Sequence, residues 1–342
     1  MVCCVTGISR LVRILHPQSP IPSPESRAPS PESRLPSPLG AVAVAKPAES
    51  RECYTPPVPI RLVAIDIDGT LLDSRWQIPE RNRLAIAEAV SRGVEVAIVT
   101  GRRHDFARPV FDELGCPVTA ITANGAMVRT ADGATALRHL LPRATARTIL
   151  QATPAHRDGA GLIFDRVREG QVVVERIDWS HPSRRGYAER NREFLIEVDP
   201  LEAALSDDPI QVFFNGRVGP MRTLVDTLRA RPDAASFTVA TTQYEARDFA
   251  MVDVLAPGCT KGAALAEWAG RRGYARSEIF ALGDNLNDLE MLEAAGVPVV
   301  MGNAVPELLA RGWTVTATAD DAGVADAIER FVLAPDRGPA TS

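Results

Sequence analysis

Short apolar runs alternate with helix-length segments in two separated parts of this 342-residue chain, and this alternation constrains the fold more than any other feature. Apolar runs that end in polar residues occur at 60–66, 94–100 and 279–284. Helical patterns accompany them at 79–92 and 261–272. Strands that are apolar throughout are typical of a parallel sheet with helices on both faces. The sequence therefore predicts a doubly wound parallel α/β core.

Residues 127–256 break this alternation. Strand candidates such as 171–177 and 210–215 have a mixed pattern, which suits an antiparallel sheet with one covered face. Strand–helix alternation resumes after that segment. We therefore expect a core formed by residues 59–126 and 257–333, with an inserted α+β domain at 127–256.

The two ends of the chain have a different composition. Residues 1–58 are rich in Pro and Ser, and the hexapeptide PSPESR at 22–27 recurs at 29–34. Such a segment has too few large apolar side chains to offset the entropy lost on ordering. We predict that residues 1–58 and 334–342 are disordered tails. An organellar transit peptide and a start codon assigned too early are both open alternatives for the first tail.

The overall composition excludes several classes of protein. A net charge of −5 gives no basic surface for nucleic acid. No run approaches the roughly 18 apolar residues of a membrane-spanning helix. The five cysteines form no CxxC pair, which argues against a zinc knuckle and fits a reducing compartment. We expect a cytoplasmic monomer or small homo-oligomer that binds neither nucleic acid nor membranes.

Polar residues follow the first two predicted core strands. Asp66 and Asp68 stand two residues apart after the first strand, and Thr100 and Gly101 follow the second. Two close carboxylates repel each other unless they share a proton or a divalent cation. A hydroxyl and backbone N–H groups at a strand-to-helix turn can cradle a phosphate. Plainer interpretations are open for both: a turn for the two aspartates and a helix N-cap for Thr100.

The segment GDNLND at 283–288 follows a third apolar strand. Its carboxylate and amide oxygens, including those of Asp284 and Asn287, are hard ligands that suit Mg²⁺. The alternative is an Asx-rich turn followed by Asp288 as a helix cap.

Lysine is rare in this chain. Of 38 basic residues only Lys46 and Lys261 are lysines, and the rest are arginines. A lysine kept against this bias indicates a place where a compact point charge is needed instead of a planar guanidinium. Chance retention on a helix surface is the alternative, because the two residue types have similar helix propensity.

Together these elements resemble the motifs of the haloacid dehalogenase-like phosphatase superfamily. They are DIDGTLL at 66–72, AIVTGR at 97–102, TKG at 260–262 and GDNLNDLEML at 283–292. NGA at 124–126 and MGNA at 301–304 add a resemblance to the Cof-type sugar-phosphatase subfamily. The resemblance covers residues 60–333. It implies a Rossmann-like catalytic core of that type, with the inserted α+β domain as a cap that closes over the substrate.

The resemblance also implies catalytic and metal-binding roles. Asp66 is expected to be the nucleophile that forms a phosphoaspartate. Asp68 is expected to protonate the leaving oxygen and then to activate water. Mg²⁺ is expected to bind Asp66, the main-chain carbonyl of Asp68 and Asp284.

Further residues are expected to hold the phosphoryl group that is transferred. These are Thr100, Gly101, Lys261 and Asn287. Three others are expected to hold these residues in position without contacting the substrate, namely Asp288, Asn124 and Arg102. In the insert, polar candidates for gripping the substrate are His181, Arg184, Arg185 and Arg247.

The predicted function is that of a Mg²⁺-dependent phosphate monoester hydrolase for a small phosphorylated metabolite, such as a sugar phosphate. A phosphotransferase or phosphomutase with the same aspartyl-phosphate chemistry is one alternative. A catalytically silent binding protein on the same fold is another, and it is disfavoured because Asp66, Asp68 and Lys261 are all present.

Overall fold

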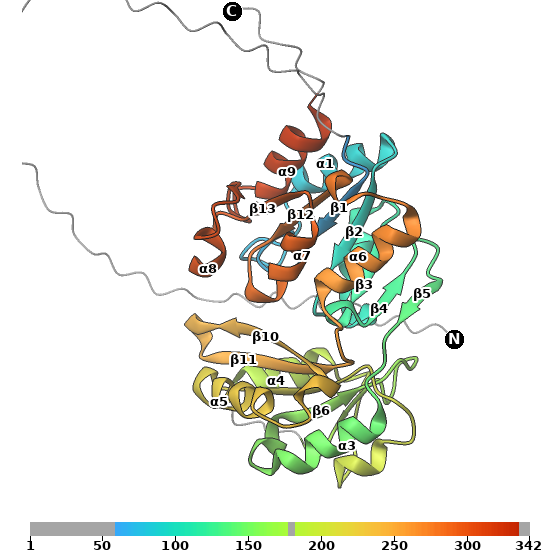
Figure 1. Cartoon of the computed structure of the whole chain (residues 1–342), viewed down its shortest axis with the longest axis vertical. Helices are drawn as coiled ribbons and strands as arrows, with labels where there is room; N and C mark the ends of the chain where they lie inside the picture. Colours follow the sequence, from blue (N-terminus) through green and yellow to red (C-terminus); the bar gives the residue numbers. More distant parts are fainter. Residues whose placement is uncertain (1–58, 177–181, 335–342) are drawn as a thin grey trace, which may run out of the picture. The chain divides into compact units, whose positions relative to one another are not determined.

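The computed structural model describes residues 59–176 and 182–334 (Figure 1). The predicted tail at 1–58, nearly all of the tail at 334–342, and His181 lie outside the described residues.

The larger sheet of the described chain has eight strands in the order β14-β13-β12-β1-β2-β3-β4-β5. They are β1 (Leu62–Ile65), β2 (Glu95–Val99), β3 (Thr119–Thr122), β4 (Met127–Arg129), β5 (Thr135–Arg138), β12 (Ile279–Gly283), β13 (Val297–Val300) and β14 (Thr314–Val315). The strands from β14 to β3 pair in parallel. β4 pairs antiparallel with both of its neighbours, β3 and β5. The predicted parallel α/β core is confirmed.

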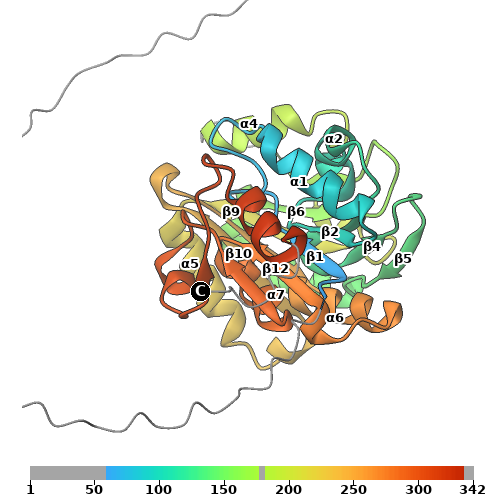
Figure 2. The same ribbon diagram turned by 90° about the horizontal axis from the view of Figure 1, so that it is seen from above.

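Helices cover both faces of this sheet, as Figure 2 shows for α1 and α6 on opposite sides of β1. They are α1 (Glu80–Ser91), α2 (His104–Leu114), α6 (Lys261–Arg272), α7 (Leu289–Ala294), α8 (Pro306–Leu309) and α9 (Gly323–Ile328), which continues into η8 (Glu329–Leu333). Val63 and Ile65 pack on the side of α1 and α9, whereas Leu62 and Ala64 pack on the side of α6. Because both sides are covered, β1 is fully buried, and this explains why its sequence is apolar throughout.

A second sheet has the order β10-β11-β9-β6-β7-β8. Its strands are β6 (Ala160–Ile163), β7 (Val172–Val174), β8 (Leu195–Glu197), β9 (Gln211–Gly216), β10 (Thr238–Tyr244) and β11 (Phe249–Leu255). The helices near it in sequence are α3 (Arg143–Ala152), α4 (Pro182–Arg190) and α5 (Val218–Arg229). All of its strand pairs are antiparallel except β7 with β8. One of its faces packs against α3 and α5, as the sequence pattern predicted.

The sequence pattern placed the start of the insert at residue 127, but the second sheet begins later in the chain, at β6. Residues 127–138 were assigned to the insert, but β4 and β5 pair with β3 and extend the larger sheet. Antiparallel pairing begins at β4 and β5, which are still part of the core sheet. The change from a parallel to an antiparallel sequence pattern therefore does not mark the point where the chain leaves that sheet. We use "cap" below for residues 139–256, which contain the whole second sheet.

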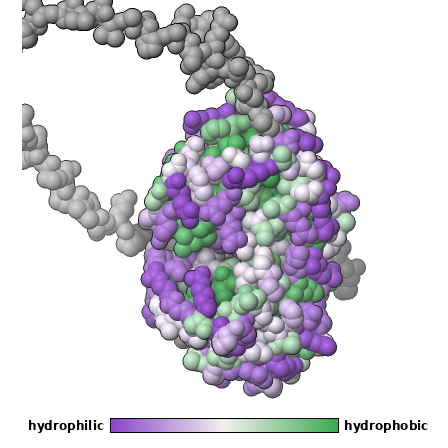
Figure 3. Space-filling view, viewed as in Figure 1, coloured by the Kyte–Doolittle hydropathy of each residue, from purple (hydrophilic) through white to green (hydrophobic). Residues whose placement is uncertain are grey.

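The visible face of the described molecule is mostly hydrophilic, with apolar residues in small separate groups (Figure 3). Among the residues that the structure describes, none of the helices has the length and apolar character needed to cross a membrane.

Candidate active site

Three adjacent parallel strands of the core end at the predicted site. β12, β1 and β2 are neighbours in the sheet, so their carboxyl ends lie at the same edge. Asp66 follows β1, Thr100 follows β2 and Asp284 follows β12. In open parallel sheets this edge is where ligands bind. The strand order thus brings together residues that are far apart in the chain.

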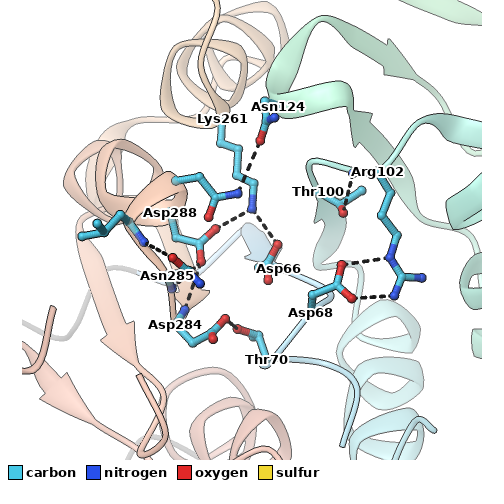
Figure 4. Close-up of polar contacts among 12 residues, drawn as sticks. Asp66, Asp68, Thr70, Thr100, Arg102, Asn124, Lys261, Asp284, Asn285 and Asp288 are labelled. Carbon is cyan, nitrogen blue, oxygen red and sulfur yellow. Dashed lines mark hydrogen bonds and ion pairs between the residues drawn. The ribbon is translucent and has the colours of Figure 1, made fainter. Parts of the chain in front are cut away.

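Lys261 lies at the centre of this group (Figure 4). It is the first residue of α6, and its Nζ donates to Asp66 Oδ1 and to Asp288 Oδ1, each over 2.6 Å. The side chain is only 1% exposed. The start of α6 is fixed by Thr260, whose hydroxyl accepts a hydrogen bond from the backbone N–H of Ala263. The alternative that Lys261 is a surface residue is therefore wrong.

The charges of this cluster are strongly coupled. Burial disfavours the ammonium group of Lys261, but the carboxylates of Asp288 and Asp66 outweigh it and raise the pKa of Lys261. Burial and the Asp288 carboxylate raise the pKa of Asp66 to about 7, although Lys261 lowers it. Burial and Asp288 also raise the pKa of Asp284 well above its ordinary value. Three buried carboxylates therefore face a single ammonium.

This donor set fits a divalent cation. Carboxylate oxygens of Asp66, Asp284 and Asp288 all lie within 4.8 Å of one another, and all three residues are buried. When its three carboxyl groups are ionised, such a cluster carries excess negative charge, and its hard oxygens suit Mg²⁺. Asp284 Oδ1 also accepts a hydrogen bond from Thr70 Oγ1 over 3.0 Å, which orients the carboxylate.

Asp288 is already engaged by protein groups. One oxygen binds Lys261, and the other accepts the backbone N–H groups of Asp284 and Asn285, each over 3.0 Å. The Asp288 side chain therefore holds Lys261 and, through a capping box, the turn that begins at Asn285, but it makes no capping hydrogen bond to α7. A Cβ atom at Gly283 would lie 2.6 Å from Asp288 Cβ, so the motif needs glycine at this position.

Asp68 turns away from the acidic cluster. Its carboxylate accepts two hydrogen bonds from Arg102, from Nε over 2.9 Å and from Nη2 over 2.5 Å (Figure 4). The guanidinium of Arg102 also lies over the ring of Phe106, 5.2 Å from its centroid. Arg102 was predicted as a supporting residue, and this contact with Asp68 is consistent with that role.

Three of the predicted phosphate-binding residues lie next to Asn124, namely Thr100, Gly101 and Asn287. Thr100 is not a helix cap, because α2 begins at His104; its Oγ1 instead accepts the backbone N–H of Arg102 over 3.1 Å. Asn124 adopts a positive φ of 51° and accepts a hydrogen bond from Asn287 Nδ2 over 3.4 Å. A Cβ atom on Gly101 would lie 3.0 Å from Asn124 Oδ1, so glycine allows this close approach.

A cavity of about 590 Å³ opens next to these residues and is lined by both the core and the cap. Of the predicted residues, Asp66, Asp68, Gly101, Arg102 and Asn287 line it. Five further predicted residues are buried and are not among the residues that line the cavity, namely Thr100, Asn124, Lys261, Asp284 and Asp288. Its volume is typical of a site for a small molecule.

The cap candidates separate into two groups. Arg247 lines the cavity, and its guanidinium lies 5.7 Å from the ring centroid of Trp76. Arg184 instead donates to Asn215 in the cap, over 3.0 Å to Oδ1 and 2.6 Å to the carbonyl oxygen. Arg185 is exposed and is not among the residues that line the cavity.

Sequence reasoning missed most of the cap residues that line the cavity, and two of these are buried polar residues. Asp253 and Gln211 are 4% and 5% exposed, and both line the cavity. Asp253 Oδ2 accepts from Asn124 Nδ2 over 2.9 Å, which ties the cap to the core. The available signal was an acidic residue in the otherwise apolar strand FAMVDVL.

The sequence model of the haloacid dehalogenase-like hydrolase family matches residues 63–328. The chain belongs to this family. An HMP-PP phosphatase of Serratia proteamaculans (strain 568) is 31% identical to this hydrolase over 248 residues, covering 72% of this chain and 86% of that protein. A phosphatase of Bacillus subtilis (strain 168) is 28% identical over 291 residues, covering 80% of this chain and 100% of that protein.

Solved structures agree with the fold of this hydrolase. A haloacid dehalogenase-like hydrolase from B. subtilis aligns with a TM-score of 0.69 at 23% identity, covering 80% of this chain and 100% of that chain. The resemblance drawn from the four motifs is therefore confirmed at the level of family and fold.

Proposed function

We propose that this hydrolase is a Mg²⁺-dependent phosphate monoesterase that acts on a small phosphorylated metabolite through a phosphoaspartate at Asp66. The observation that carries the proposal is the buried Lys261 ammonium between Asp66 and Asp288, beside a cavity that Asp66 lines. A fixed cation at this point can stabilise the charge that develops on a phosphoryl group. Relatives named as phosphatases support the reaction class.

In the first step, a carboxylate oxygen of Asp66 attacks phosphorus and the bond to the leaving oxygen breaks. Asp68 gives its proton to that oxygen, and the free alcohol leaves. In the second step, water attacks the phosphorus of the phosphoaspartate and passes a proton to Asp68. Orthophosphate leaves and Asp66 is regenerated.

Asp68 must leave its pair with Arg102 and take up a proton from solvent before it can donate to a leaving oxygen, because Arg102 binds both of its carboxylate oxygens. We infer that entry of the substrate loosens this pair. Lys261, the Gly101 amide, Thr100 and Asn287 are the proposed contacts of the other phosphoryl oxygens.

The metal would be held by Asp66, Asp284 and the main-chain carbonyl of Asp68. Bound Mg²⁺ would neutralise the negative charges of the nucleophile and the phosphoryl group as they approach. The excess of buried carboxylates over the single ammonium supports this assignment.

The experiment is a screen of phosphorylated metabolites with Mg²⁺, scored by release of inorganic phosphate, with Asp66→Asn as the inactive control. Stoichiometric phosphate release from at least one compound is expected. Appearance of an isomerised or transferred phosphate without free orthophosphate would favour the phosphotransferase alternative. Binding of the compounds with no turnover at all would favour the silent binding protein.

A further inference from the structure

The turn at Ala123–Gly125 lies against the loop that follows β2. The backbone N–H of Ala123 donates to the carbonyl oxygen of Arg102 over 2.8 Å, and that of Asn124 donates to the carbonyl oxygen of Thr100 over 3.0 Å. Ala123 and Asn124 both adopt a positive φ, of 50° and 51°. Residues other than glycine rarely adopt this conformation, and the surrounding structure has to hold them in it. The turn therefore fixes the Asn124 side chain beside the proposed phosphate contacts.

The side chain of Asn124 links a cap residue to one of those contacts. Its Nδ2 donates to Asp253 Oδ2 over 2.9 Å, and its Oδ1 accepts from Asn287 Nδ2 over 3.4 Å. Asp253 lies on β11 in the cap, whereas Asn287 follows β12 in the core and lines the cavity. Three side chains from separate segments thus form one chain of hydrogen bonds from the cap to the cavity wall.

The cap end of this chain determines the direction of every hydrogen bond in it. An ionised carboxylate can only accept, whereas an amide donates through its nitrogen and accepts through its oxygen. Because Asp253 accepts from Nδ2 of Asn124, the oxygen of Asn124 must face Asn287, which must then present its own Nδ2. The second hydrogen of that Nδ2 group can be donated to a phosphoryl oxygen. If the Asn124 amide were turned over, Asn287 would offer its oxygen there, and two acceptors would face each other.

Asp253 is itself held in the form that this chain requires. It is 4% exposed, and its second oxygen, Oδ1, accepts from Gln211 Nε2 over 2.7 Å. Burial raises the pKa of Asp253 to about 7, and the hydrogen bond from Asn124 lowers it. Among the residues that the structure describes, no basic side chain forms an ion pair with Asp253. A buried carboxyl group without a cation is costly, and this cost indicates a specific use for the group.

We propose that Asp253 is a positioning residue, which fixes the amide of Asn124 and through it presents Nδ2 of Asn287 to the phosphoryl group. This proposal rests on the proposed phosphatase function and adds a residue of the cap to it. Because Asp253 belongs to the cap and Asn124 to the core, Asn287 is fully oriented only when the cap contacts the core. Contact of the cap and formation of the phosphate site are thereby coupled.

The test uses a phosphate analogue without a leaving group, so that contacts between the cap and a leaving group do not contribute. Orthovanadate resembles the phosphoryl group during transfer, and its inhibition constant, Ki, does not depend on the fraction of enzyme that is folded. Ki is measured with Mg²⁺ at about pH 8, where Asp253 is mostly ionised, against the best substrate of the metabolite screen. Asp253→Leu removes both acceptor oxygens and should raise Ki about tenfold, as expected for one hydrogen bond.

A double-mutant cycle with Asn287→Ala shows whether Asp253 acts through Asn287. Asn287→Ala should raise Ki by at least about tenfold, and Asp253→Leu added to it should change Ki by less than about twofold. The matched control is Asn215→Leu. Asn215 is a buried polar residue of the neighbouring strand β9, but it binds Arg184 and is not among the residues that line the cavity. The control should leave Ki unchanged in both backgrounds.

A second variant breaks the chain of hydrogen bonds in the middle and leaves the cap unchanged. Asn124→Gly removes the amide, and glycine tolerates the positive φ at this position. It should raise Ki as much as Asp253→Leu does, and it should have equally little effect in Asn287→Ala. The proposal is overturned if either variant leaves Ki unchanged, or if either raises Ki by the same factor with Asn287 and with Ala at this position. Absence of phosphate release from every metabolite by the wild type would instead refute the phosphatase function itself.

Discussion

The ammonium of Lys261 lies 2.6 Å from a carboxylate oxygen of Asp66, although 195 residues separate the two along the chain. Both side chains are buried, and the same ammonium binds Asp288 at the same distance. A buried cation held between two carboxylates is costly to change, because removal of one partner leaves an uncompensated charge. The pair therefore gives sharp predictions for both residues.

Lys261→Arg should lower turnover at least ~100-fold, about 2.7 kcal/mol of barrier, and should also lower the melting temperature, because the larger side chain enters a fully buried position. The guanidinium keeps the charge but is broader, so it would displace the phosphoryl group or move Asp66 out of line. Steady-state kinetics and thermal unfolding measure the two effects. The control is Arg271→Lys, an exposed position of the same helix, which should be silent. Wild-type kinetics for Lys261→Arg would move the phosphate contact to another basic residue.

Asp66→Asn should lower turnover by at least ~1000-fold while the protein remains folded, because the attacking carboxylate is lost. Asn preserves the shape of the side chain, and a neutral group is easier to bury at this position. The exposed Asp112→Asn serves as the matched control. Retention of more than about a tenth of wild-type turnover, a loss below about 1.4 kcal/mol, would contradict the assignment of the nucleophile.

Mg²⁺ should raise the melting temperature as well as support turnover, because it binds the folded state only. Asp284→Ala should abolish this thermal shift, whereas the exposed Asp112→Asn should keep it. Ca²⁺ should inhibit, since it accepts more ligands at longer distances than Mg²⁺ does. Full activity in excess chelator, together with no thermal shift, would rule out the metal site at Asp284.

Glu95 should make stability depend on pH. Burial alone would raise its pKa, but donors from Trp268, Arg272, Thr119 and Tyr274 lower the pKa below the ordinary value of 4.5. A group whose pKa is lowered by folding stabilises the protein above its unfolded pKa and loses this effect as pH falls.

Glu95→Gln should therefore cost about 1.5–3 kcal/mol at pH 7, and the difference from wild type should shrink as pH falls below about 4.5. Denaturant unfolding at several pH values measures this difference. The control variant is Glu307→Gln, at an exposed position, and it should change the free energy of unfolding little at any pH. A Glu95→Gln cost that is constant with pH would show that the charge of Glu95 is not responsible.

Much of the fold and of the site was determined by local sequence. The largely apolar runs at 60–66 and 94–100 predicted buried parallel strands, and the polar residues at strand ends predicted where Asp66, Thr100 and Asp284 would meet. The rarity of lysine singled out Lys261. These inferences succeed for two reasons. A short apolar run indicates a buried strand, and in a doubly wound sheet the residues that follow such strands meet at the edge where ligands bind.

Only the tertiary structure decided which residues meet across the cavity. Gln211, Tyr244 and Asp253 belong to three different strands of the cap, and no local pattern says which face of that sheet borders the core. The pairing of Asp68 with Arg102, and the place of β4 and β5 in the larger sheet, depend in the same way on contacts between distant segments. Periodicity assigns a side chain to one of two faces, whereas the packing of the whole chain determines what lies opposite each face.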